Sequence, residues 1–138
     1  VHAGAHGNGQ VAKICNNMIL GVSMIVVSEA FTLGQKLGLS AEKLFEISSH
    51  SSGQCWSMTS YSPVPGLVPT SPANHDYAPG FTAQMMLKDL RLSQQAALAA
   101  NIATPLGALA TELYSLFVNQ ECGQLDFSGI IRMISGKC

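Results

Sequence analysis

The sequence predicts an all-α fold, a helical bundle built around one long N-terminal helix. Residues 10–37 form a stretch without proline in which apolar residues dominate every face. No segment shows the alternating apolar and polar pattern of a β-strand, and start signals precede most of the later helical segments. A chain of 138 residues buries about two thirds of the surface that its unfolded form exposes. We therefore expect residues 1–138 to form a single domain with its own core.

The first helix is expected to run from Gln10 to Leu37, because no proline interrupts it and Gly34 and Gly38 mark its exit. At about 1.5 Å per residue, roughly 28 residues extend about 40 Å. This is longer than a compact body of this size comfortably hides. An apolar helix of this length forms the spine of a domain or extends into a partner.

The shorter helices follow from their start signals and from the positions of the prolines. Ser40 is the expected N-cap of the second helix. Thr104 as N-cap and Pro105 at the first helical position open the fourth, and Asp126 caps a short last helix. The expected ranges are 41–49, 81–101, 105–119 and 126–134.

Residues 51–80 differ in composition from the helical segments. Five of the six prolines lie here, together with serine, asparagine and glycine. A loop this long inside a compact domain is more often a functional loop than a connector. We therefore expect this segment to have a function.

The chain carries few charges. Hydrophobic residues make up 47 % and charged residues 11 %, whereas an ordinary soluble domain is about 25 % charged. Three stretches have no Asp, Glu, Lys or Arg at all, namely 14–28, 47–75 and 92–111. Since isolated proteins rarely expose large apolar patches, part of this surface is expected to face another domain or a second copy of the chain.

Two classes of partner are excluded by the charges and by the apolar stretch. The net charge is −1 and the seven basic residues are scattered, so no nucleic-acid-binding surface is expected. The uncharged stretch 14–28 is shorter than the roughly 20 residues that a membrane helix needs. It therefore predicts a buried helix and no membrane partner.

Cysteines and histidines are placed irregularly along the chain. No C-x-x-C pair and no histidines at a spacing of four occur, so reduced thiols in a reducing compartment are expected, and no metal site. These residues are Cys15, Cys55, Cys122, Cys138, His2, His6, His50 and His75.

The glycine-rich segment 4–9 resembles a phosphate-binding turn only superficially. No hydrophobic strand precedes it, and no βαβ unit surrounds it. We interpret Gly7 and Gly9 as the tight turn that leads into the long helix.

Lys13 and Asn17 share one face of an otherwise apolar helix, because they are four residues apart. The residues alone leave two interpretations open for Lys13: a side chain that snorkels at the helix start, and a functional lysine. A cation near a helix N-terminus faces the positive end of the helix dipole, which favours the neutral amine. Because a neutral amine is a general base, Lys13 is a candidate catalytic residue.

Three motifs carry a resemblance to a known family. They are G-x-G-x-x-x-K-x-x-N-N at residues 7–17, S-S-G-Q-C-W continuing to Y-S-P-V-P-G at residues 51–66, and the segment from Gly80-Phe81 to the K-D-L of residues 88–90. In this order they resemble the β-hydroxyacid dehydrogenases, the family that includes the 3-hydroxyisobutyrate and 6-phosphogluconate enzymes. The second motif is similar to the 3-hydroxyisobutyrate branch. Together the motifs cover essentially the whole chain.

The resemblance implies a fold and a set of site residues. The chain would be the all-helical C-terminal domain of a 6-phosphogluconate-dehydrogenase-like enzyme, without the N-terminal Rossmann domain that binds most of the NAD. Lys13 would be the catalytic base and Asn17 would orient the substrate, while Lys88 would contact the cofactor and Asp89 would help to position it. Trp56 and Tyr61 would shape the substrate pocket, although each is equally well explained as an anchor of the loop.

The resemblance also implies an activity. The complete enzyme would oxidise 3-hydroxyisobutyrate to methylmalonate semialdehyde in valine catabolism, with NAD as cofactor, and the chain alone would be inactive. Alternatives are a serine or tartronate semialdehyde type of 3-hydroxyacid dehydrogenase, or a non-catalytic helical dimerisation domain; the choice between NAD and NADP stays open. A homodimer or homotetramer is expected, in the cytoplasm of a bacterium or in the mitochondrial matrix of a eukaryote.

Overall fold

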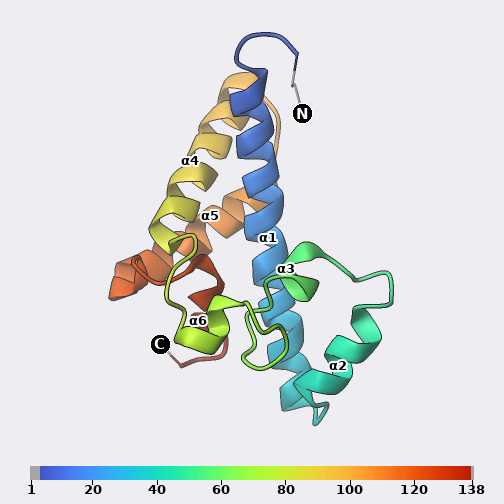
Figure 1. Ribbon diagram of the computed structural model, residues 1–138. Coiled ribbons are helices and arrows are strands. Elements are labelled where there is room, and N and C mark those ends of the chain that lie inside the picture. Colours follow the sequence, from blue (N-terminus) through green and yellow to red (C-terminus); the bar gives the residue numbers. More distant parts are fainter. Residues whose placement is uncertain (1–3, 138) are drawn as a thin grey trace.

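The computed structural model describes residues 4–137, and the regular structure within this range is helical (Figure 1). This confirms the predicted all-α class. A single isolated β-bridge in the described range joins Thr82 to Asp126. The elements are α1 (Asn8–Lys36), α2 (Ala41–Ser48), α3 (Trp56–Thr59), the 3₁₀ helix η1 (Pro72–His75), α4 (Ala83–Ala100), α5 (Pro105–Phe117), the π-helical turn η2 (Val118–Cys122), the 3₁₀ helix η3 (Phe127–Gly129) and α6 (Ile130–Ile134).

Helix α1 is the spine of the domain and runs along its whole length (Figure 1). It contacts α4 and α5 on one side, and α2, α3 and α6 pack against it as well. One buried cluster joins α1 to α4, α5 and α6 and includes Met24 and Tyr114. A second cluster joins α1 to α2 and α3 and includes Phe31 and Met58. The predicted helical bundle around one long helix is thus confirmed.

By length and composition alone, α1 also meets the requirements of a membrane-spanning helix, with a mean hydropathy of 1.6 over its most apolar window. The core helix of a globular domain meets the same requirements. In this fold 33 % of that window is buried inside the protein, where α1 packs into the two hydrophobic clusters. We therefore describe α1 as a helix that contributes one face to the core.

Of the predicted caps Ser40 and Thr104, the structure confirms the first and not the second. Ser40 caps α2 as expected, because its Oγ accepts a hydrogen bond from the Lys43 N–H at 3.2 Å. Thr104 does not cap α5, although α5 begins at Pro105 as predicted. Its hydroxyl instead donates to Oε1 of Gln94 on α4 at 3.1 Å. The prediction of a Thr104 cap was wrong because a partner on the neighbouring helix takes up the hydroxyl.

The boundaries of α4, α5 and the last helix also shift. Thr82 caps α4 through a 3.1 Å hydrogen bond from the Met85 N–H, so α4 begins after the predicted start at Phe81. Helix α5 ends at Phe117 and passes into η2. Asp126 is a cap as predicted, but it caps the 3₁₀ helix η3, which leads into α6.

Residues 51–80 form an ordered segment that contains α3 and η1. Asn74 accepts a 2.7 Å hydrogen bond from the Gly66 N–H and donates one of 2.7 Å to the Val68 carbonyl. The Tyr77 hydroxyl donates to the Pro63 carbonyl at 2.6 Å. These contacts bend the segment back onto itself and place its beginning beside α1.

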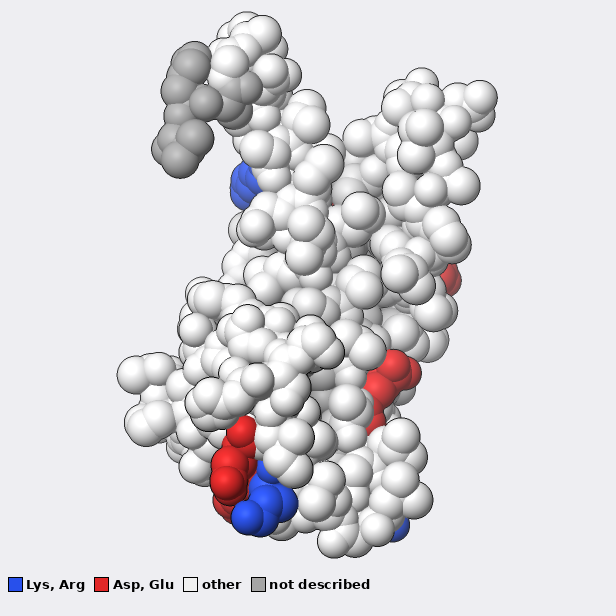
Figure 2. All heavy atoms as spheres, turned by 90° about the vertical axis from the view of Figure 1, so that its right-hand side faces the viewer, with Lys and Arg blue, Asp and Glu red and all other residues white. Residues whose placement is uncertain are grey.

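The low charge of the sequence is visible on the surface. On the face shown in Figure 2, charged side chains are few. Near the bottom, acidic and basic side chains lie next to one another. Large apolar side chains are exposed, among them Leu98 on α4 and Leu106 and Leu109 on α5. A groove of about 320 Å³ between α1 and α5 is lined by apolar residues except for Glu29.

Candidate functional site

The structure brings three of the predicted site residues together in one pocket, which we call the aromatic pocket. It has a volume of about 270 Å³ and lies where the middle of α1 meets α3 and the segment before α4. Asn17, Trp56 and Tyr61 come from distant parts of the sequence and all line it. The lining residues are Asn17, Leu20, Trp56, Tyr61, Gly80, Phe81 and Phe127.

Lys13 lies one helical turn before Asn17 on α1, outside the set of residues that line the aromatic pocket. Its side chain is exposed and forms no hydrogen bond or ion pair with another described residue. The first turn of α1 contains no acidic residue. Lys13 is therefore not held by a carboxylate of the described chain, and its amine is free to reach toward a ligand beside Asn17.

Asn17 is fixed by a buried carboxylate on α4. Its Nδ2 donates a hydrogen bond of 2.7 Å to Oδ2 of Asp89, whose side chain is only 2 % exposed. An ionised carboxylate can only accept hydrogen bonds, so this contact determines which end of the Asn17 amide faces α4. The Oδ1 of Asn17 does not bond to Asp89 and accepts a hydrogen bond of 3.3 Å from Nδ2 of Asn16. Asp89 is thus the hydrogen-bond partner that orients the Asn17 amide.

Tyr61 forms one wall of the aromatic pocket with its ring. Its hydroxyl points away from the pocket and donates to Oδ1 of Asp126 at 2.6 Å. Burial, together with the hydrogen bond to Asp126 and its charge, holds the pKa of Tyr61 well above the usual range of a phenol. Tyr61 therefore stays protonated near neutral pH and does not act as a base in this pocket.

Trp56 stacks on Tyr61 with ring centroids 4.9 Å apart and an angle of 19° between the planes. Tyr61 stacks in turn on Phe127 at 5.4 Å. Trp56 is 52 % exposed and also lines a neighbouring hollow of about 430 Å³. Its indole is thus the outer edge of the aromatic pocket and separates it from this hollow.

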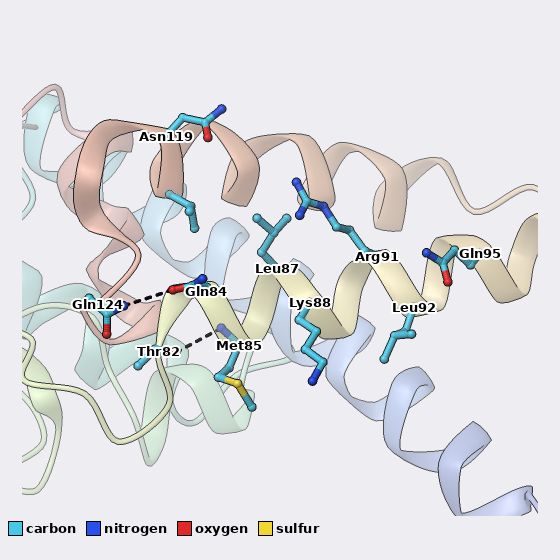
Figure 3. A pocket seen from close by; sticks show the side chains of 11 residues that line it. Thr82, Gln84, Met85, Leu87, Lys88, Arg91, Leu92, Gln95, Asn119 and Gln124 are labelled. Carbon is cyan, nitrogen blue, oxygen red and sulfur yellow. Dashed lines mark hydrogen bonds between the residues drawn. The ribbon is translucent and has the colours of Figure 1, made fainter.

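Lys88 lies on a different surface from its neighbour Asp89. It is exposed and lines a groove of about 650 Å³ along α4, together with Arg91 and Gln95. Figure 3 shows Arg91 directed toward α5 and Lys88 directed away from it. No residue of this groove lines the aromatic pocket. The described chain therefore does not bring Lys88 together with Asn17, Trp56 and Tyr61.

No group of three or more His, Cys, Asp or Glu side chains in residues 4–137 is arranged to hold a metal ion. Cys15 and Cys55 carry free thiols, as predicted. Cys138 and His2 lie outside the described residues.

Gly80, Phe81 and Asp126 also belong to the site, although the sequence does not indicate this. The sequence predicts Phe81 inside a helix and Asp126 only as a cap. The available signal was an acidic residue next to Phe127 in a segment with few charges. Nothing in the local pattern shows that its partners lie at positions 61 and 80.

Comparison with known proteins defines the family. A family model described as "NAD-binding of NADP-dependent 3-hydroxyisobutyrate dehydrogenase" matches residues 7–134. The chain belongs to the 3-hydroxyisobutyrate dehydrogenase family. The match contains the complete aromatic pocket as well as Lys13, Lys88 and Asp89. It confirms the family resemblance that the three sequence motifs indicated.

Individual members of the family are similar over nearly the whole chain. The 3-hydroxyisobutyrate dehydrogenase of Pseudomonas aeruginosa is 48 % identical over 138 residues, which cover 99 % of this chain and 46 % of that protein. The NAD-dependent L-serine dehydrogenase of the same organism is 48 % identical over 132 residues, covering 96 % and 44 %. The solved structure of 3-hydroxyisobutyrate dehydrogenase from Mycobacterium tuberculosis with L-serine has a TM-score of 0.94 at 47 % identity, covering 97 % of this chain and 46 % of that chain.

Two conclusions follow from these similarities. The chain spans less than half of the length of the relatives that it matches. The 3-hydroxyisobutyrate and L-serine enzymes are equally similar to it, so overall identity does not distinguish between these two substrates.

Proposed function

We propose that this chain is the C-terminal catalytic domain of an NAD-dependent 3-hydroxyisobutyrate dehydrogenase, which oxidises 3-hydroxyisobutyrate to methylmalonate semialdehyde in valine catabolism. The observation that supports it most is that Lys13 lies one turn from Asn17 on α1. Asn17 lines the aromatic pocket together with Trp56 and Tyr61. The enzyme would combine this chain with an N-terminal Rossmann domain. We call that combination the two-domain enzyme.

In the proposed mechanism, this chain supplies the proton acceptor and the substrate-orienting groups. NAD, held mainly by the Rossmann domain, would supply the hydride acceptor. Asn17 orients the substrate through the amide atoms that Asp89 leaves available. Lys13 in its neutral form takes the proton of the substrate hydroxyl. Lys88, an exposed cation without an ion pair to a described residue, is the residue that we assign to cofactor contact.

The lining of the aromatic pocket favours a methyl substituent over an ammonium group on the substrate. Asn17 and Tyr61 are its polar side chains, and none of the lining residues is charged. An ammonium group buried without a charged partner is costly, whereas a methyl group gains from burial against aromatic rings. This supports 3-hydroxyisobutyrate over the serine alternative.

The deciding experiment is the Lys13→Ala variant of the two-domain enzyme. Losing a general base is expected to lower kcat by at least about 100-fold. Lys43→Ala is the matched control, since Lys43 is an exposed lysine on α2. If Lys13→Ala retained kcat within about threefold of the wild type, Lys13 would have no part in the mechanism. Comparing kcat/KM for 3-hydroxyisobutyrate and L-serine in the wild type tests the substrate assignment.

A second candidate function is supported by the apolar groove between α1 and α5. Exposed Leu106 and Leu109 line it, so a helical dimerisation domain without catalytic function is an alternative. Such a domain would tolerate Lys13→Met and Asn17→Leu without loss of function. In the proposed enzyme the same groove would contribute to a homodimer or homotetramer, in the cytoplasm of a bacterium or in the mitochondrial matrix of a eukaryote.

A further inference from the structure

Asp126 is a fully buried carboxylate that accepts five hydrogen bonds. Its Oδ1 accepts from the Tyr61 hydroxyl at 2.6 Å, from the Gly80 N–H at 2.9 Å and from the Phe81 N–H at 3.0 Å. Its Oδ2 accepts from the N–H and the hydroxyl of Ser128, at 3.0 Å and 2.5 Å. The exposed fraction of Asp126 is 0 %, so the carboxylate itself is shielded from water.

The two oxygens of Asp126 serve different parts of the molecule. All three donors to Oδ1 belong to residues that line the aromatic pocket, whereas Ser128 does not line it. A backbone hydrogen bond of 2.7 Å from the Phe127 N–H to the Phe81 carbonyl reinforces the same junction. Asp126 therefore joins three separate segments of the chain directly behind one wall of the pocket.

The packing at this junction leaves no room for another side chain. A Cβ on Gly80 would lie 2.8 Å from the Tyr61 hydroxyl oxygen and 3.8 Å from Oδ1 of Asp126. An added methyl group would therefore displace the phenol from the carboxylate, since real Cβ contacts are essentially never this short.

Trp56 depends on the same junction indirectly. Its indole forms no hydrogen bond with another described residue, and it is placed by stacking on Tyr61. Because the Trp56 ring is half exposed and stacks on Tyr61, its position depends on the ring beneath it. The sequence of contacts runs from Asp126 through Tyr61 to Trp56.

We propose that Asp126 is a positioning residue that fixes the aromatic wall of the pocket through Tyr61, Gly80 and Phe81. The statement that this wall faces the substrate rests on the proposed function. The statement that Asp126 holds the wall in place does not rest on it. Asp126 lies behind the ring of Tyr61, so it acts through that ring and not by contact with the substrate. Its removal affects how tightly and in which orientation a substrate is held, more than the proton transfer at Lys13.

The experiment compares three variants that change the contacts at Oδ1 of Asp126 with one that changes a contact at Oδ2. Tyr61→Phe removes only the hydroxyl that donates to Asp126. Gly80→Ala keeps every polar group but displaces the Tyr61 hydroxyl. Asp126→Asn replaces the carboxylate with an amide. Ser128→Ala is the matched control, because it removes a hydrogen bond from Oδ2, on the side of Asp126 away from the pocket.

Two measurements are made on each variant. KM and kcat for 3-hydroxyisobutyrate are measured in the two-domain enzyme. Acrylamide quenching of Trp56 fluorescence is measured in the 138-residue chain, where Trp56 is the only tryptophan. The second measurement needs no catalysis, so it tests the junction even if the proposed function fails.

We expect all three junction variants to raise KM about tenfold with kcat within about threefold of the wild type, the scale of losing one hydrogen bond to a charged group. The quenching constant of Trp56 should rise in each, because a shift of the Tyr61 ring uncovers the indole face that stacks on it. Ser128→Ala should leave both values near those of the wild type. The proposal is overturned if Tyr61→Phe and Gly80→Ala leave Trp56 quenching unchanged, or if Ser128→Ala changes it as much as they do.

Discussion

The helical half of the site and its loop half are held in place by different interactions. In the helical half, one buried carboxylate, Asp89, accepts one described hydrogen bond, from Asn17 across the contact between α1 and α4. In the loop half, Asp126 accepts five. The helical half consists of Lys13, Asn17 and Asp89, and the loop half of Trp56, Tyr61, Gly80, Phe81 and Phe127.

The difference follows from the backbone. Within a helix, backbone N–H groups after the first turn bond to carbonyls of the same helix, so a helical carboxylate has to find a side-chain donor on another element. In a turn, backbone N–H groups have no such partners, and one carboxylate can gather several of them. Regular structure thus positions the reactive groups, and a single acidic side chain positions the irregular wall beside them.

Asp89→Leu is expected to break the helical half alone. Without the carboxylate, the Asn17 amide loses its fixed orientation, and leaving a partly buried donor unsatisfied costs about 1–3 kcal/mol. In the two-domain enzyme, Asp89→Leu should lower kcat/KM by about 10- to 100-fold. Asp89→Asn keeps an acceptor oxygen, so it should lower kcat/KM by a smaller factor. Trp56 quenching should stay at its wild-type value. A parallel change in quenching would show that the two halves are not independent.

Alkaline pH is expected to weaken the loop half. Burial raises the pKa of Tyr61 and that of Tyr114, whose hydroxyl donates to the Phe127 carbonyl; it also raises the pKa of Tyr77. A folded-state pKa above the unfolded value of about 10 means that the stabilising contribution of the neutral phenol is complete below pH 10. It is lost as the pH rises toward the folded-state pKa.

The free energy of unfolding should therefore fall above about pH 10. Helix content from circular dichroism and tyrosinate absorbance should change together. Tyr61→Phe and Tyr114→Phe should each remove part of this pH dependence. Ionisation of all three tyrosines near pH 10 with full helix content retained would contradict the prediction.

The smallest expected effect concerns two serines on α1. Ser28 is fully buried, and its hydroxyl has no hydrogen-bond partner among the described residues. Ser28→Ala should therefore raise the free energy of unfolding slightly, by up to about 1 kcal/mol. Ser23 bonds to the Ser57 hydroxyl of α3 at 2.7 Å, so Ser23→Ala should lower it by about 1 kcal/mol. Urea denaturation measures the change in the free energy of unfolding for both variants. Changes of the same sign would contradict the view that Ser23 is hydrogen-bonded and Ser28 is not.

The helical half could be predicted from the sequence because its information is local. The absence of proline and the apolar faces of residues 10–37 place α1, and a spacing of four residues puts Lys13 and Asn17 on one face. Even here the pairing of Asn17 with Asp89 was not predicted, since it depends on how α1 and α4 meet. The role of Lys13 as a base remains a prediction.

The loop half could be predicted only in part. The motifs led to Trp56 and Tyr61 through family resemblance, but not to their stacking or to the carboxylate behind them. Tyr61 and Asp126 lie 65 positions apart, and no local pattern encodes such a partner. The incorrect Thr104 cap has the same origin, because the hydroxyl bonds across to Gln94 on another helix.

The Thr104–Gln94 hydrogen bond has a consequence for association with a partner. It ties the start of α5 to α4 close to the turn between them, next to exposed Leu98, Ile102 and Leu106. A surface that is already ordered loses little conformational freedom when another molecule covers it. We therefore expect this apolar tip to present a preorganised contact surface, so that binding there proceeds without a folding step.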